Sequence, residues 1–241
     1  MSFEPTATGA AAEPGPTPAT AGRSATVELT PAMRLQILST EHWSLLASRS
    51  LAWNESFARA GMFLSLLSGA VVALALVAQA TAFGEGFALF ALVILPVVLF
   101  VGIATVIRLG GANRHDAMCV VGMNRIRGAY LEIAPDMAPY FVMSPHDDGR
   151  GVGVTMAFDP RGSHLVAELV ATPAVIGVVN SVVAASIGTL AALRLGAPAI
   201  PALLIGIAVF AVAEWLHIAY GRLHRRRGMG DLKPLFPSPP G

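Results

Sequence analysis

Residues 60–84 read AGMFLSLLSGAVVALALVAQATAFG and contain no Asp, Glu, Lys or Arg. Three further stretches, 86–107, 169–193 and 195–213, share this property. Each is long enough to form a transmembrane helix, which needs ~17–25 residues to cross a bilayer core. We therefore expect an all-α integral membrane protein with four transmembrane helices in two hairpins, at about residues 60–82, 86–107, 170–193 and 199–221.

The composition of the whole chain agrees with this expectation. Of its 241 residues, 54% are apolar and 13% are charged, and the mean hydropathy is +0.64. Soluble domains carry about 25% charged residues. The four charge-free stretches therefore exclude a soluble globular enzyme, a secreted disulfide scaffold and a disordered chain. Cys119 is the single cysteine, so an intrachain disulfide is also excluded. The net charge of +1 gives no reason to expect a nucleic-acid partner.

The positions of the basic residues predict the orientation of the helices. Fifteen of the sixteen Lys and Arg residues precede the first stretch, lie between the second and third, or follow the fourth. Only Arg194 lies in the turn between the third and fourth. Short cytoplasmic loops retain basic residues. We therefore expect a multi-pass protein of the inner (plasma) membrane with both termini in the cytoplasm.

Helical patterns extend beyond the membrane on the first two spans. Thr30 and Pro31 are typical of a helix start, and no Gly or Pro interrupts the chain from there to Gly61. An apolar seam is expected on this extension, and a second one on the continuation of span two from about 113 to 133. The expected seam residues are Leu38, Leu45 or Leu46, Trp53, Phe57 and Ala60 on the first extension, and Cys119, Gly122, Ile126, Ala129 and Ile133 on the second.

These two extensions are expected to pack on each other as a cytoplasmic stalk.

The remaining parts divide into a disordered tail (1–29), rich in Pro, Ala, Gly and Thr, a cytoplasmic loop (135–159) and a basic then Pro-rich tail (223–241). The first hairpin with its extensions is expected over 30–134. The second is expected over 160–222, with a helix resuming near residue 159 and entering the third span.

Few polar groups lie within the spans. Glu214 and His217 share one helix face, and Asn180 lies in the middle of span three. A carboxylate in a membrane helix is costly and often functional. Because Glu214 lies about 22 Å along its helix, we favour an ion pair with an arginine at the cytoplasmic interface over a proton, cation or metal site. For Asn180 we favour an interhelical hydrogen bond.

Small residues recur every four positions in two spans, at Gly61, Ser65 and Gly69 and at Gly177 and Ser181. Such stripes allow helices to approach closely in lipid. We favour packing within one chain, and an interface between subunits is the alternative.

Polar clusters also lie outside the spans. A solvated turn is favoured over a divalent-cation site for His146-Asp147-Asp148, and residues 113–116 are expected to form a polar turn of helix beside the membrane. A further cluster follows the last span and would attract anionic lipid head groups, at about 1 kcal/mol for each basic residue. Its members are Arg222, Arg225, Arg226 and Arg227.

Two segments carry a resemblance to known proteins. Residues 39–55, STEHWSLLASRSLAWNE, and 122–127, GMNRIR, resemble a set of bacterial multi-pass integral membrane proteins to which no activity is assigned. The resemblance implies a bacterial origin. The architecture is also similar to that of bacterial conflict-system effectors, in which a transmembrane hairpin carries long cytoplasmic helices, although the second hairpin departs from that pattern.

No catalytic motif, phosphate-binding loop, metal-ligand pattern or cofactor signature is present in the sequence. We expect a non-enzymatic membrane protein that self-associates, as a homo-oligomer, or binds a protein partner through its cytoplasmic helices. The alternative is an ion-conducting pore or small transporter with Glu214 and Asn180 lining the path.

Overall fold

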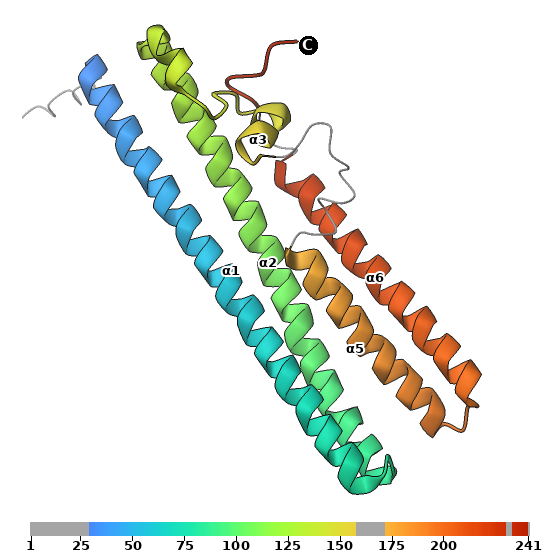
Figure 1. Cartoon of the computed structure of the whole chain (residues 1–241). Coiled ribbons are helices and arrows are strands. Elements are labelled where there is room, and N and C mark those ends of the chain that lie inside the picture. Colours follow the sequence, from blue (N-terminus) through green and yellow to red (C-terminus); the bar gives the residue numbers. More distant parts are fainter. Residues whose placement is uncertain (1–28, 158–171, 230–232, 241) are drawn as a thin grey trace, which may run out of the picture.

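The computed structural model describes residues 29–157, 172–229 and 233–240, and these contain helices and no strand. The predicted all-α class is therefore confirmed. Figure 1 shows the arrangement of the elements, which are α1 (Pro31–Thr81), α2 (Glu85–Ile133), the 3₁₀ helix η1 (Pro135–Tyr140), α3 (Gly149–Thr155), α5 (Thr172–Arg194) and α6 (Ala199–Met229).

The first two helices are much longer than a bilayer is thick. α1 has 51 residues and α2 has 49, so each is about 75 Å long at 1.5 Å per residue. α1 begins where the sequence predicted, with the Thr30 hydroxyl accepting a hydrogen bond from the Met33 N–H (3.2 Å) and Pro31 in the first turn. Both helices run without interruption from their apolar halves into their polar halves.

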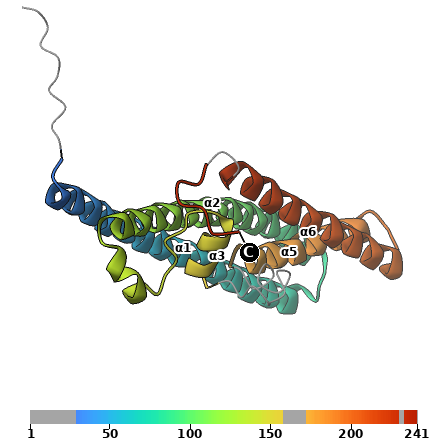
Figure 2. The ribbon, with the colours of Figure 1, turned by 90° about the horizontal axis from the view of Figure 1, so that it is seen from above.

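α2 is the central helix of the molecule. It packs along α1 on one side and against α5 on another, and α6 packs mainly on α5 (Figures 1 and 2). The half of α2 next to the α1–α2 turn is flanked by α5 and α6, whereas its other half carries α3 and the C-terminal segment. The shared core contains Phe63 of α1, Val98 and Leu109 of α2, and Ile176 of α5.

Both interhelical turns lie at the same end of the molecule. The α1–α2 turn is short, and Gly84 is needed there because a Cβ at this position would lie 2.8 Å from the Thr81 carbonyl oxygen. Arg194, at the end of α5, donates a hydrogen bond from Nη2 to the Gly84 carbonyl (2.9 Å). This contact joins the α5–α6 turn region to the α1–α2 turn.

Four helices are long and apolar enough to cross a membrane: α1, α2, α5 and the part of α6 from Ala199 to Leu223. Most of each apolar stretch is not covered by other parts of the chain, and large side chains such as Val72, Phe100 and Ile200 are at least 60% exposed. Exposed apolar area of this extent suits helices that are surrounded by hydrocarbon.

The contact between α1 and α2 beyond the membrane-length region uses smaller residues than the sequence suggested. Ser56 and Ala60 are buried on the α2 side of α1, and Ala52 is half-buried. Phe57 is 60% exposed, so its placement in the seam was wrong. Ser56, the residue before it, is buried instead, and the Phe57 ring lies outside the contact. Trp53 lies at its edge, with 39% exposure.

The connection after α2 is more ordered than predicted. A loop was expected over 135–159, but η1 and α3 lie within it. α3 forms because Asp148 caps it, its carboxylate accepting the Gly151 N–H (2.8 Å). The expected tail at 1–28 and the helix expected to resume near residue 159 lie outside the described residues, and α5 begins at Thr172.

Candidate functional site

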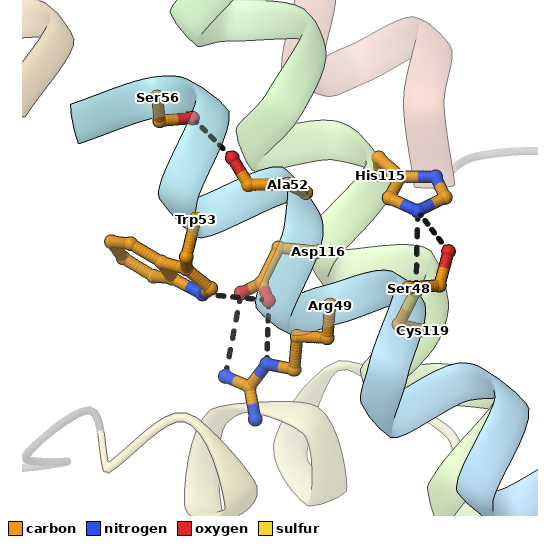
Figure 3. A network of polar contacts seen from close by, with 8 residues as sticks. All are labelled: Ser48, Arg49, Ala52, Trp53, Ser56, His115, Asp116 and Cys119. Carbon is orange, nitrogen blue, oxygen red and sulfur yellow. Dashed lines mark hydrogen bonds and ion pairs between the residues drawn. The ribbon is translucent and has the colours of Figure 1, made fainter. Parts of the chain in front are cut away.

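Three polar sites contain the chemically distinctive side chains of the described chain. The first is centred on Asp116, between α1 and α2 (Figure 3). Its carboxylate is 3% exposed and accepts hydrogen bonds from Arg49 Nε (2.5 Å) and Trp53 Nε1 (3.0 Å). The polar turn of helix expected at 113–116 lies within α2, where residues 113–115 are exposed and Asp116 is buried against α1.

A second contact lies beside it, where the Ser48 hydroxyl meets His115 Nε2 (3.0 Å). Cys119 lies one turn further along α2, with its sulfur 3.6 Å from the same nitrogen. Burial raises the pKa of the Cys119 thiol, and the nearby Asp116 carboxylate raises it further. A thiol that stays protonated is a poor nucleophile. The first site therefore joins α1 and α2 through Asp116, Arg49, Trp53, Ser48 and His115.

The second site lies between α5 and α6. The Ser181 hydroxyl, fully buried, donates toward Glu214 Oε2 (3.0 Å) and lies 3.4 Å from His217 Nδ1. Gly177 lies beside this contact, and a Cβ there would be 3.5 Å from the His217 side chain, an ordinary van der Waals distance. Among the described side chains Glu214 forms no ion pair, so the arginine partner expected for it is not found there.

Asn180 is adjacent in sequence but faces a different helix. It is fully buried, and its amide oxygen lies where a Cβ on Gly102 of α2 would be, 1.8 Å away. Within the described chain neither amide atom has a hydrogen-bond partner, so the interhelical hydrogen bond expected for Asn180 is not formed there. Asn180 therefore faces α2, whereas Ser181 and Glu214 meet between α5 and α6, and the two groups do not share one face of α5.

The third site was not expected from the sequence. Residues His146-Asp147-Asp148 were read as a solvated turn, but the Asp147 side chain is fully buried. It forms an ion pair with Arg125 of α2 (2.6 Å). Both of its oxygens also accept main-chain hydrogen bonds from the C-terminal segment, at Leu235 (2.9 Å) and Phe236 (2.8 Å).

This turn is held to α2 by Asn124, which is fully buried. The Asn124 amide donates to the His146 carbonyl (2.7 Å) and its oxygen accepts from the Thr155 hydroxyl of α3 (2.9 Å). Together, α2 and α3 present a rigid surface, which we call the α2–α3 platform. Its contacting residues are Arg125, Gly128, Asp147, Asp148 and Arg150.

The electrostatics of the platform favour ionised aspartates. Burial alone would raise the pKa of Asp147, but hydrogen bonds from the Leu235 N–H, Arg125 and the Phe236 N–H outweigh it and hold the pKa below 3.8. Burial also opposes ionisation of Asp148, and its hydrogen bonds from Gly151 and Ser238 likewise bring its pKa below 3.8. Both carboxylates are therefore anionic acceptors at neutral pH.

The remaining sequence candidates are placed as follows. Gly61 and Gly69 lie on an open face of α1, where a Cβ on either would meet no described atom within 4 Å, and Ser65 between them is exposed. The expected packing of this stripe within the chain was therefore wrong. Arg222 is exposed, and the side chains of Arg225, Arg226 and Arg227 lie outside those described.

Groups of three or more His, Cys, Asp or Glu side chains that could hold a metal ion are not found in the described residues. Comparison of the chain with protein-family models, with curated proteins and with solved structures finds no match. The candidate sites are therefore interpreted from their own geometry.

Proposed function

We propose that this is a non-enzymatic protein of the bacterial inner membrane that self-associates through one face of α1. This face, which we call the outer α1 face, is turned away from α2 over most of the helix. Its residues recur at steps of three or four, and all are exposed: Trp43, Ala47, Ser50, Asn54, Phe57, Gly61, Ser65 and Gly69.

The observation that carries the proposal is the continuity of this face across two environments. In the apolar half of α1, Gly61, Ser65 and Gly69 would let a second helix approach closely in lipid, where small residues promote association. In the polar half, Trp43 and Phe57 are 71% and 60% exposed. Large apolar side chains on the aqueous part of a membrane protein indicate a contact surface. A second copy of α1 presents the matching pattern to both halves.

The proposed threading places both interhelical turns on the periplasmic side, with the extensions of α1 and α2 and both termini in the cytoplasm. It is supported by the grouping of the two turns at one end through Arg194 and Gly84. It is also supported by the concentration of the other basic residues toward the opposite end of the spans.

The test is the mass of the full-length protein in lipid nanodiscs or mild detergent, measured by light scattering. We expect a dimer or larger oligomer for the wild type, and Gly61→Leu to shift it toward monomer because the side chain separates the helices. Gly111→Leu is the matched control, since its Cβ also meets open space but lies on α2. A monomeric wild type, or an unchanged oligomer in Gly61→Leu, would contradict the proposal.

A proton or cation path is the second candidate function, and the arrangement of Glu214 favours it. This half-buried carboxylate is approached by the hydroxyl of Ser181 and the ring of His217. Within the described residues this carboxylate has no ion-pair partner, and a carboxylate within a membrane helix is suited to bind a proton or a small cation. Asn180 lies on another face of α5, so we place Glu214 and His217 on this path and leave Asn180 outside it.

Liposomes test this second candidate. Proteoliposomes should show proton or monovalent-cation flux that falls in Glu214→Gln and is unchanged in Glu55→Gln, in which an exposed carboxylate of α1 is neutralised. Flux equal to that of protein-free liposomes would exclude it.

A further inference from the structure

The C-terminal segment 233–240, KPLFPSPP, is bound to the α2–α3 platform through its main chain. Pro237, Pro239 and Pro240 have no N–H, so residues 235–240 contain three main-chain N–H groups. The two aspartates of the platform accept hydrogen bonds from all three, those of Leu235, Phe236 and Ser238.

Each aspartate accepts hydrogen bonds from two donors of the C-terminal segment, one on each oxygen. Asp147 takes the adjacent N–H groups of Leu235 and Phe236, and its own N–H donates back to the Phe236 carbonyl (3.2 Å). Asp148 takes the N–H of Ser238 on one oxygen and its hydroxyl on the other, both at 2.8 Å. The spacing of the two aspartates therefore matches a Leu-Phe-Pro-Ser sequence. In this sequence Pro237, which has no N–H, separates the two donors that bind Asp147 from the two donors that bind Asp148.

The side chain of Phe236 fits a position that glycine leaves open. A Cβ on Gly128 of α2 would lie 2.6 Å from Cγ of the Phe236 ring, so the ring lies directly over this glycine. At the two ends of the segment, Arg125 Nη2 donates to the Lys233 carbonyl (2.9 Å) and Arg150 Nη1 to the Pro239 carbonyl (3.4 Å). The platform thus combines main-chain acceptors, main-chain donors and a place for one aromatic ring.

The platform is assembled by bonds that do not involve the segment. Asn124 fixes the turn before α3 through the His146 carbonyl, and Asp148 caps α3 through the Gly151 N–H. Arg125 pairs with Asp147 within the platform itself. A proline-rich chain already favours an extended conformation, so little conformational entropy is lost when it binds. These are the features of a preformed site with a peptide ligand.

We infer that the α2–α3 platform is a peptide-recognition site for extended Leu-Phe-Pro-Ser segments, and that residues 233–240 are its displaceable ligand. The same segment of a second copy of this chain has the same chemistry and can replace it. This inference goes beyond the proposed self-association of α1 and does not depend on it, because none of the platform residues belongs to the outer α1 face.

The experiment measures binding of a fluorescent peptide, KPLFPSPP, to full-length protein in detergent by fluorescence anisotropy. In the wild type the chain's own segment competes for the site. In Phe236→Ala that segment is weakened and the platform is intact. We expect the peptide to bind Phe236→Ala at least about tenfold more tightly than the wild type, because apparent affinity scales with the fraction of free sites.

Two further variants, made in the Phe236→Ala background, test whether the peptide binds at the α2–α3 platform. Asp147→Ala removes the acceptor of two N–H groups, and Gly128→Leu fills the space under the ring while leaving the charges unchanged; both should abolish binding. Thermal unfolding of each variant verifies that it is folded, and a peptide with Ala in place of Phe is the ligand control. Equal affinity of Phe236→Ala and the wild type, or peptide binding that survives Gly128→Leu, would overturn the inference.

Discussion

At the scale of single residues, the role of each acidic group depends on what faces it. Glu55 and Asp116 both pair with arginine, but Glu55 is half exposed at its side chain and Asp116 is 5% exposed. Exposed ion pairs contribute little because water competes for both partners. A buried carboxylate has lost its water and depends on the donors of the protein.

Asp116→Asn should therefore destabilise the protein by about 1.5–3 kcal/mol, the range for hydrogen bonds to a charged group. Asparagine keeps the shape but removes the charge that Arg49 faces. The measurement is the free energy of unfolding of the purified protein in detergent. Glu55→Gln is the matched control and should not change it measurably. Equal effects of the two substitutions would show that burial is not the cause.

The effect of replacing a glycine likewise depends on the atoms around it. Gly102→Ala should lower stability by about 1–3 kcal/mol because the methyl group overlaps two buried side chains that have no space to move, with Asn180 Oδ1 at 1.8 Å and Phe63 Cε2 at 2.7 Å. Gly111→Ala, in the same helix with open space around it, should be neutral or stabilising. Melting temperatures in one detergent compare the two. If Gly102→Ala melts at the same temperature as the wild type, Gly102 of α2 does not contact Asn180 of α5 this closely.

At the scale of elements, the C-terminal segment should leave the α2–α3 platform at acidic pH. The pKa values of Asp147 and Asp148 are lowered below 3.8 when the segment is bound. A lowered pKa stabilises the bound form above the ordinary pKa, and this stabilisation is lost as the pH falls through and below 3.8. The other charged groups around the two carboxylates are His146, Arg125 and Arg150.

A fluorine label on the Phe236 ring reports this transition by nuclear magnetic resonance. The bound and free ring should give different shifts, with the bound form lost below pH 3.8 and fully present at pH 6. Asp147→Asn/Asp148→Asn should show the free signal at all pH values. A transition centred near pH 6 would instead implicate a histidine.

The contact between α1 and α2 shows how far the apolar spacing of α1 predicts its buried residues. Of the expected alternatives Leu45 and Leu46, it is Leu45 that meets Gly122 of α2, and Ala60 is buried as expected. The apolar spacing failed for Phe57, because the pattern ranks residues by hydrophobicity. Which face of α1 meets α2 is decided by the packing of the whole chain, and Ser56, the residue beside Phe57, is the one buried there.

At the scale of the whole molecule, the threading predicts which positions reach the periplasm. In a Cys119→Ala background, Phe83→Cys in the α1–α2 turn should react with a membrane-impermeant thiol reagent added to intact cells. Arg150→Cys in the first turn of α3 should react only after the membrane is permeabilised. Both positions are exposed in the structure, so a difference reports the side of the membrane. The reverse labelling pattern would invert the topology.

The sequence alone determined the helical class and the four membrane-length helices, because the exclusion of charge from a stretch is a local property of the chain. The partners of its polar groups were decided by tertiary structure. Asp116 meets Arg49 from another helix, and Asp147 meets a segment 88 residues away. These contacts depend on which helix faces meet, and that follows from the packing of the whole chain.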